Sequence, residues 1–298
     1  MPDAQHMPPM NPPTTEVIAR VFEMLNRSQF VLIGAGAGMS VDAGFDYTSE
    51  SQFVRRYPVM AARGPRCRYD MFGFDWPNDA VKWGHLARHL EEIRFGMIPN
   101  REPYDQLRAL TDSKDRFVIT SNADDLFDRT GFSADRIFTP QGSYRRLQCL
   151  SACQPTSTWL CEGWVREAVK KIDLATEELT DPKLHPKCPN CGGEAMMNVR
   201  GGDWFVETPY RDQADRLAQW LARAQAGKLL VFDVGTGFNT PGVIRWPGEQ
   251  IAFEHPDAFF VRINVDHPEV PVELQSRAIA LRATGSDVWS ALTELRRP

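Results

Sequence analysis

The stretch from Phe30 to Tyr47, FVLIGAGAGMSVDAGFDY, constrains the fold of this chain more than any other. It opens with a short apolar run, residues 30–33, of the kind that forms a fully buried strand. Gly34, Gly36 and Gly38 follow, and without a Cβ the chain can turn sharply while its N–H groups close on a phosphate. A helix starting here adds partial positive charge where the phosphate would lie. The stretch predicts a strand, a dinucleotide-binding turn and a helix; a glycine-rich turn without a ligand is the alternative.

Strands and helices alternate along much of the remaining sequence. Apolar runs predict strands at Phe117–Thr120, Ile137–Phe138, Lys228–Val234, Phe259–Ile263 and Ala278–Arg282. Amphipathic spacing predicts helices at Thr14–Asn26, Pro103–Leu110 and Gln213–Ala226, and a last helix opens at Gly285-Ser286-Asp287. Polar turns follow the strands, at the edge where open parallel sheets bind ligands. The pattern predicts an α/β fold with a Rossmann-like, doubly wound parallel sheet built from residues 15–143 and 204–298.

A helical, aromatic segment interrupts this pattern between residues 45 and 100. Its aromatic side chains, which include Trp76 and Trp83, predict a small helical subdomain that forms a lid. His85 and His89 stand one helical turn apart within it. Such a pair can bind a metal, but a partly buried helical pair without a ligand is the expectation we favour.

Cysteines mark a second interruption, at residues 144–203, where strand signals are weak. Two close pairs, Cys149 with Cys153 and Cys188 with Cys191, have the spacing of a four-thiolate zinc site, and glycines after Cys191 can donate N–H groups to the sulfurs. Four thiolates leave no open position, so we expect a structural zinc in a small inserted module. Reduced, buried thiols without metal are the alternative. We expect Cys67 and Cys161 to be structural.

The composition bounds what the protein does. The 298 residues are enough for one large or two modest domains, and the net charge of −5 gives no electrostatic footprint for DNA or RNA. The apolar runs are far shorter than the ~20 residues of a membrane span, so we expect no membrane association. Residues 1–14 are rich in proline and methionine, and we expect a disordered tail without a signal peptide. Paired cysteines without a secretory signal predict a reducing, cytoplasmic location.

Taken together, the motifs resemble those of the sirtuins in the same order along the chain. Gly36 to Gly44 resembles the GAGxSxxxG motif, Thr120 to Leu126 resembles TQNIDxL, and Gln141-Gly142-Ser143 stands where the family has His-Gly-Ser. The two cysteine pairs follow at the family's position. Gly235-Thr236-Gly237, Asn264 and Gly285-Ser286-Asp287 match later family motifs. The resemblance covers nearly the whole chain beyond residue 14 and implies an NAD-binding Rossmann-like domain.

The departures from the family pattern are equally informative. Deacylating sirtuins use a histidine as general base where this chain has Gln141, and an amide accepts no proton near neutral pH. Gly44-Phe45-Asp46-Tyr47 replaces the Asp-Phe-Arg of the family, and Ser121 and Phe127 replace a glutamine and a histidine. These changes resemble the class M, macrodomain-linked sirtuins. That resemblance implies protein ADP-ribosyltransferase activity, a lipoylated glycine-cleavage H-like acceptor, a macrodomain protein as functional partner and a role in oxidative stress.

The resemblance also implies roles for individual residues. Asn122 would hold the ribose or a water, Asp124 would bind the nicotinamide amide unless it only caps the next helix, and Gln141 would position a ribose hydroxyl or the acceptor. Asp46 and Tyr47 would lie on the lid. The complete cofactor-binding set is Gly36, Ala37, Gly38, Ser40, Gly44, Asp46, Tyr47, Ser121, Asn122, Asp124, Gln141, Gly235, Thr236, Gly237, Asn239, Asn264, Val265, Asp287 and Val288. A residual deacylase or NAD hydrolase, and a non-catalytic sensor of NAD or ADP-ribose, are the alternative functions.

Overall fold

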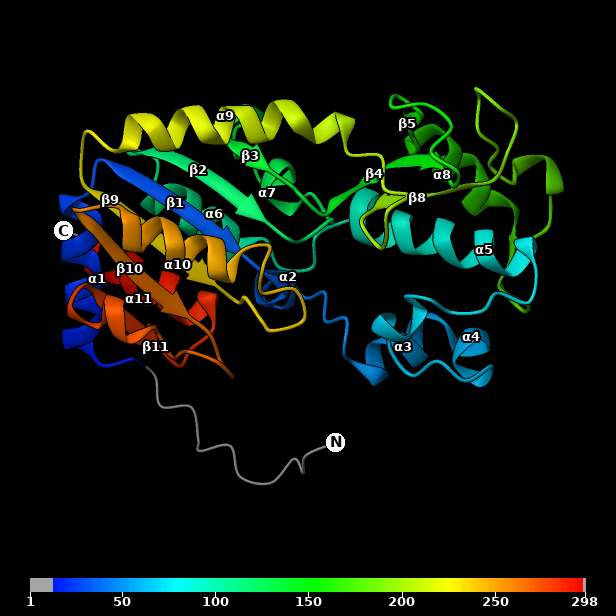
Figure 1. Cartoon of the computed structure of the whole chain (residues 1–298). Helices are drawn as coiled ribbons and strands as arrows, with labels where there is room; N and C mark the ends of the chain where they lie inside the picture. Colours follow the sequence, from blue (N-terminus) through cyan, green and yellow to red (C-terminus); the bar gives the residue numbers. More distant parts are fainter. Residues whose placement is uncertain (1–12, 297–298) are drawn as a thin grey trace.

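The structure, a computed structural model, describes residues 13–296. The predicted tail at residues 1–14 lies almost wholly outside this range. A six-stranded parallel sheet forms the centre of the larger of two lobes, which lies in the left part of Figure 1. Its strand order is β11-β10-β9-β1-β2-β3, as a doubly wound sheet requires. The strands are β1 Phe30–Ala35, β2 Asp115–Thr120, β3 Ile137–Phe138, β9 Leu229–Val234, β10 Ala258–Ile263 and β11 Ala278–Leu281.

The central strands are buried on both faces because helices cover both sides of the sheet. Leu32 packs with one hydrophobic cluster, which includes Trp220, while its neighbours Val31 and Ile33 face the other cluster. The helices of the first face are α9 Thr208–Ala224 and α10 Arg245–Glu254. Those of the opposite face are α1 Thr15–Arg27, α6 Glu102–Leu110 and α11 Gly285–Arg296. The predicted strands and helices of this lobe are thus confirmed, with shifts of a few residues at their ends.

The register of the sheet gathers the strand ends at one edge. Ala35, the last residue of β1, pairs with Thr120 of β2 on one side and with Val234 of β9 on the other. The turns after these three strands therefore meet, and the short helices α2 Ala37–Asp42 and α7 Leu126–Arg129 begin there.

The helical segment folds as predicted into several short helices. They are α3 Glu50–Arg56, α4 Pro58–Ala62, a 3-10 turn at Arg68–Met71, α5 Asp79–Leu90 and a π-helical turn at Glu91–Phe95. The rings of His85 and His89 are buried and nearly parallel, with centroids 6.3 Å apart. Burial holds the pKa of His89 at about 3 and that of His85 well below its usual range. No group of three His, Cys, Asp or Glu ligands within residues 13–296 includes either ring.

The cysteine module has more strand than its sequence indicated. Three antiparallel strands, in the order β5-β4-β8, form its sheet: β4 Gly142–Cys149, β5 Thr158–Leu160 and β8 Ala195–Val199. A two-stranded ribbon, β6 Ile172–Asp173 with β7 Glu178–Leu179, and helix α8 Glu162–Ala168 complete it. Helix α5 contacts both β7 and α8, so the helical subdomain and the cysteine module pack together as one smaller lobe (Figure 1). The sequence had indicated two separate units.

Candidate active site

Two glycine turns, one after β1 and one after β9, touch each other backbone to backbone. The Gly36 N–H donates to Val234 O at 2.9 Å, and the Gly38 N–H donates to Gly235 O at 3.1 Å. A Cβ on Gly36 would lie 2.5 Å from Gly235 O, and one on Gly38 would lie 2.6 Å from Gly235 Cα. Gly235 itself has φ of +61°, a region that favours glycine. These glycines are therefore required by the close approach of the two turns.

A cavity of about 590 Å³ opens beside these turns at the junction of the two lobes. Sixteen residues of the predicted cofactor-binding set line it: Gly36, Ala37, Gly38, Ser40, Asp46, Tyr47, Ser121, Asn122, Asp124, Gln141, Gly235, Thr236, Gly237, Asn239, Asn264 and Val265. The structure thus brings together segments that are up to about 230 residues apart in the sequence.

Three residues of the predicted set lie outside this lining. Gly44, at φ of +95°, packs against Pro99. The Asp287 carboxylate accepts hydrogen bonds from the Thr284 N–H and hydroxyl at the start of α11, which bears out its expected position near a helix N-terminus. Val288 is fully buried in the hydrophobic core.

The polar turn after β2 carries the predicted catalytic amide and carboxylate. The Asn122 side chain donates from Nδ2 to Gly36 O at 2.8 Å, which fixes this turn against the glycine turn of β1. The Asp124 carboxylate accepts from the Ser40 hydroxyl at 2.6 Å and from the Leu126 N–H at 3.0 Å. Burial raises the pKa of Asp124 to about 6, although the Ser40 hydrogen bond opposes this shift. Asp124 therefore both faces the cavity and holds the start of α7.

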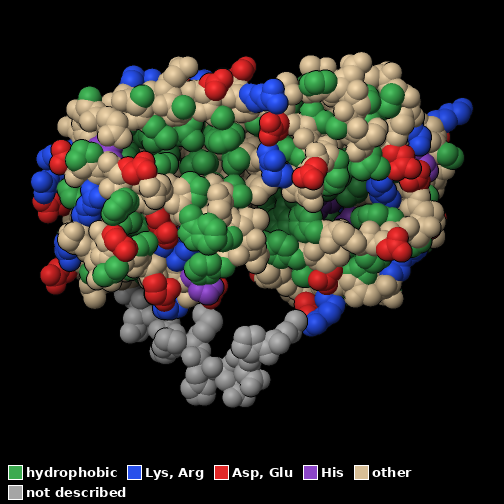
Figure 2. Space-filling model, viewed as in Figure 1, with side chains coloured by type: hydrophobic (Ala, Val, Ile, Leu, Met, Phe, Trp, Pro, Cys, Tyr) green, Lys and Arg blue, Asp and Glu red, His purple; other side chains and the backbone are tan. Residues whose placement is uncertain are grey.

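Gln141 separates this cavity from a second one of about 340 Å³. Its side-chain Oε1 is buried and has no hydrogen-bond partner, whereas its backbone carbonyl accepts from the Arg200 N–H at 2.9 Å. An unpaired buried amide oxygen is costly, so this atom is available to a ligand donor. The second cavity is mostly apolar, and Figure 2 shows hydrophobic side chains gathered on the large lobe between α9 and α10. The residues that line the second cavity are Ile119, Phe138, Pro140, Gln141, Arg200, Gly242, Val243 and Pro247.

The far end of the main cavity is held by internal polar contacts. Asn264 donates to Thr236 O at 2.6 Å and accepts from the His267 N–H at 2.9 Å, so its amide joins the turns after β9 and β10. Arg245, which is almost fully buried, donates to the carbonyls of Thr236 and His267. Beneath it, the buried Arg262 pairs with Asp233 at 2.9 Å.

Sequence reasoning missed several residues that line the cavity. The Tyr47 hydroxyl donates to the Tyr144 hydroxyl at 3.2 Å, which links the lid to strand β4. The Asp42 carboxylate accepts from the Ser286 N–H at 3.0 Å, and burial raises its pKa to about 6. Arg245 and Tyr144 fall outside the recognised motifs, and Asp42 occupies an unspecified position within the Gly36–Gly44 motif, so no signal in the sequence pointed to them.

The four predicted cysteine ligands come together at the far side of the small lobe. The sulfurs of Cys149, Cys153, Cys188 and Cys191 all lie within 4.8 Å of one another. The Gly193 N–H donates to the Cys191 sulfur at 3.4 Å, as expected for a knuckle turn. Four thiolates in one cluster fit a closed structural zinc site. Cys161 lies elsewhere, with its thiol donating to Tyr144 O, and burial raises its pKa to about 12.

Comparison with known proteins gives relatives that are named as ADP-ribosyltransferases or as a sirtuin, although no protein-family model matches the chain. The chain is 38% identical over 234 residues to a probable bifunctional ADP-ribose hydrolase/ADP-ribosyltransferase of Fusarium oxysporum f. sp. cubense. That match covers 77% of this chain but only 39% of the relative. The chain is 24% identical over 266 residues to a protein ADP-ribosyltransferase of Staphylococcus aureus, covering 86% and 81% of the two. It is 24% identical over 238 residues to the bovine mitochondrial NAD-dependent protein lipoamidase sirtuin-4, covering 70% and 67%.

Solved structures of Sir2 proteins share the fold. A structure on the mechanism and regulation of Sir2 enzymes matches with a TM-score of 0.56 and 18% identity, covering 95% of this chain and all of the other. A mutant Sir2 homologue in complex with ADP ribose matches with a TM-score of 0.56 and 20% identity, covering 93% and 96%. No helix within residues 13–296 is both long and apolar enough to cross a membrane.

Proposed function

We propose that this chain is a sirtuin and acts as an NAD-dependent protein mono-ADP-ribosyltransferase. The reaction breaks the bond between nicotinamide and C1′ of its ribose, releases nicotinamide, and forms a bond from C1′ to an ionised nucleophile of a protein acceptor. Both curated relatives named as ADP-ribosyltransferases support this proposal, as does the loss of the family's histidine at Gln141.

The chain's own residues suit the binding of NAD. The two glycine turns line the part of the cavity where a pyrophosphate would be cradled, and Asn264 and Val265 line the end that would take the adenosine. The Asp124 carboxylate, ionised above about pH 6, would accept from the nicotinamide amide. Asn122 would present its free Oδ1 to the ribose, because its Nδ2 is committed to Gly36. NAD supplies the activated ribose, and these groups orient it.

One observation carries the choice of transfer over deacylation: Gln141 lies between two cavities with its Oε1 buried and unpartnered. An amide can orient a ribose hydroxyl but takes up no proton near neutral pH. An acceptor whose nucleophile is already ionised, such as a carboxylate, needs no base at this position. The apolar second cavity would hold the acceptor segment against Gln141 and exclude the water that otherwise hydrolyses NAD.

We extend the proposal to the acceptor protein, the functional partner and the cellular location. The resemblance to class M sirtuins supports a lipoylated glycine-cleavage H-like protein as acceptor, a macrodomain protein as functional partner and a role in oxidative stress. The name of the Fusarium relative pairs an ADP-ribose hydrolase with a transferase, which supports a partner that reverses the modification. Cysteines that cluster as candidate metal ligands support a reducing, cytoplasmic location.

The test is mass spectrometry after incubation with NAD and, in parallel, a lipoylated carrier protein, the same carrier without lipoate, and an acetyl-lysine peptide. We expect an added ADP-ribose on the lipoylated carrier, lost in Gln141→Ala and in Asn122→Ala. Gln250→Ala, an exposed glutamine on α10, is the matched control and should keep full transfer. Release of the ADP-ribose by neutral hydroxylamine would identify a carboxylate ester.

Other outcomes decide against the proposal. Deacetylation of the peptide without carrier modification would contradict it and would mean that another group replaces the family's histidine. Free ADP-ribose and nicotinamide with every acceptor would favour an NAD hydrolase. If Asn122→Ala binds NAD normally and no chemistry is seen in the wild type, the protein is a sensor.

A further inference from the structure

Asp125 follows the predicted catalytic residue Asp124 but does not line the cavity. Its backbone has φ of +57° and ψ of +25°, a left-handed conformation that glycine adopts freely and that costs other residues energy. Its side chain is only 8% exposed. A buried carboxylate is costly unless it is paired, so the partners of this side chain indicate what holds it there.

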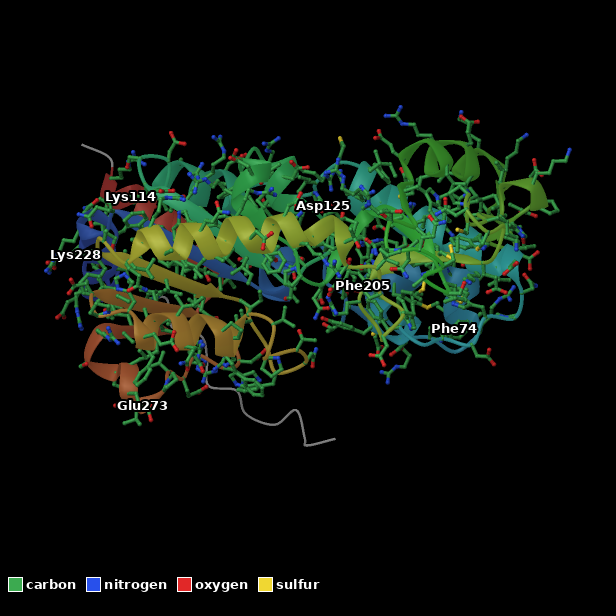
Figure 3. The ribbon with its side chains drawn as sticks, turned by 45° about the horizontal axis from the view of Figure 1, so that its top comes forward. Phe74, Lys114, Asp125, Phe205, Lys228 and Glu273 are labelled. Atoms are coloured by element: carbon green, nitrogen blue, oxygen red, sulfur yellow. The ribbon has the colours of Figure 1, made fainter. Side chains whose placement is uncertain are left out.

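The Asp125 carboxylate joins three parts of the molecule. Its Oδ2 accepts from the Ser143 hydroxyl at 2.6 Å, on strand β4, and from Arg94 Nε at 2.7 Å, on the π-helical turn of the helical subdomain. Asp125 itself belongs to the turn after β2. Figure 3 labels Asp125 where the two lobes meet. The same carboxylate oxygen therefore holds the large lobe, the cysteine module and the lid-bearing helices at one point.

The segments that Asp125 joins lie next to the residues of the proposed chemistry. Ser143 lies two residues after Gln141 on β4, and the Tyr144 N–H donates to Ala123 O at 2.8 Å beside it. These two contacts attach the start of β4 to the turn that carries Asn122 and Asp124. Gly142, between Gln141 and Ser143, has φ of +101° and leaves no room for a Cβ beside Asn198 O, so this segment has little freedom to compensate.

We propose that Asp125 is a positioning residue, whose bonds to Ser143 and Arg94 set Gln141 against the Asn122–Asp124 turn. The inference rests on the proposed function, because it assigns Asp125 to the transfer of ADP-ribose. It acts through Gln141 and touches neither NAD nor acceptor. Removing its bonds frees Gln141 to move by a fraction of an ångström or more, which misplaces the ribose and the acceptor.

The chain offers a matched control in Glu177. This residue also has a left-handed backbone, with φ of +59°, is 2% exposed and pairs with an arginine, Arg88, at 2.8 Å. It lies in the small lobe at the start of β7, away from the cavity lining. Asp125→Gly and Glu177→Gly each remove a buried carboxylate, strand an arginine and relax a left-handed residue, so we expect both to lower the melting temperature. Only Asp125→Gly should affect transfer.

The first measurement is kinetic. For Asp125→Asn and Asp125→Gly we expect kcat to fall about tenfold to a hundredfold, with the dissociation constant of NAD within about threefold of wild type, since small misplacements of reacting groups have effects of this size. Glu177→Gly should keep kcat. Because Gln141→Ala is expected to lose transfer, the coupling is measured in Gln141→Asn: adding Asp125→Asn to it should lower kcat by less than the two single losses combined, since Asp125 acts through Gln141. An additive double variant, or an equal loss of kcat in Glu177→Gly, would overturn the proposal.

The second measurement does not depend on activity. Deuterium exchange of the peptide covering residues 141–147 should be faster in Asp125→Gly than in wild type and unchanged in Glu177→Gly. Unchanged exchange in Asp125→Gly would overturn the positioning role even if kcat falls. If the wild type shows no chemistry on NAD, the proposed function fails, and faster exchange at residues 141–147 still supports the structural part of the inference.

Discussion

The two lobes of this protein differ in the kind of contact that holds each of them together internally. In the large lobe the site is built from backbone: the turns after β1 and β9 approach so closely that a Cβ on Gly36 would meet Gly235 O at 2.5 Å. In the small lobe the cysteine cluster is instead built from side chains, the thiols of Cys149, Cys153, Cys188 and Cys191. The cavity turns of the large lobe should therefore fail when atoms are added, and the cysteine cluster of the small lobe when its metal is removed.

Removing the metal should have the largest effect. In Cys188→Ser, or after chelation, we expect strands β4, β5 and β8 to lose their fixed pairing, because structural zinc contributes about 10 kcal/mol or more in small zinc-binding peptides. Zinc stoichiometry by mass spectrometry and deuterium exchange of residues 144–203 measure this. Cys67→Ser, which changes a thiol outside the cluster, should keep one zinc and normal exchange. Loss of protection in β1 and β9 as well would break the comparison, since the large sheet has its own core.

Adding one methyl group to the large lobe should come next. In Gly36→Ala the new Cβ meets backbone atoms of Gly235 and Thr236, which cannot yield as a side chain does. Overpacking costs about 1–3 kcal/mol even where side chains can move, so we expect NAD affinity to fall about a hundredfold, measured by calorimetry. Gly163→Ala on α8 is the control, because its Cβ has no atom within 4 Å. Equal NAD affinity in both variants would show that the two turns need not stay in contact.

This contrast also explains what the sequence could predict. The strands of the large sheet are apolar runs such as Leu229–Val234, buried at every position, and the turn residues Asn122 and Asp124 follow such a run directly. Local pattern therefore predicted them. The pairing of β4 with β8 joins residues about 50 positions apart, and no local pattern specifies it.

The residues that sequence reasoning missed or misplaced have a shared physical cause. Arg245, Tyr144 and Asp125 owe their roles to packing between segments, which only the folded chain shows. Asp287 was assigned to the cavity as part of a matching motif, and Val288 because it follows that motif. In the fold one caps α11 and the other is buried beneath it, since neighbours on a helix point in different directions.

A single hydrogen bond at the edge of the cavity, between Ser40 and Asp124, should affect the pH dependence of activity. The Ser40 hydroxyl donates to the Asp124 carboxylate and so favours its charged form, opposing the effect of burial. In Ser40→Ala the pKa of Asp124 should rise further above about 6, by about one unit, because a hydrogen bond to a charged group contributes about 1.5–3 kcal/mol. The acid limb of nicotinamide release against pH should move up accordingly. Ser290→Ala on α11 should leave that limb in place.

Protonation of Asp124 changes the stability of the fold in the opposite direction to acid unfolding, which distinguishes the two causes of lost activity at low pH. The folded pKa of Asp124 lies above the ordinary 3.8, so the folded state takes up a proton first as pH falls through about 6. Between about pH 6 and 4 this carboxyl therefore stabilises the fold as activity is lost. The wild type should therefore gain stability relative to Asp124→Asn over this range, and an identical dependence of the melting temperature on pH in the two proteins would contradict the assignment of the limb to Asp124.

The smallest effect should come from a surface pair that matches a buried one in geometry. Arg101 Nε lies 2.7 Å from Asp105, and Arg94 Nε lies 2.7 Å from Asp125, but the arginine side chains are 57% and 13% exposed. We expect Arg101→Ala to leave the melting temperature within about 1 °C of wild type, since exposed pairs contribute little. Arg94→Ala should lower the free energy of unfolding by about 3–5 kcal/mol, because it strands the buried Asp125 carboxylate. Equal effects in thermal melts would mean that burial between the lobes is not what gives the Arg94 contact its strength.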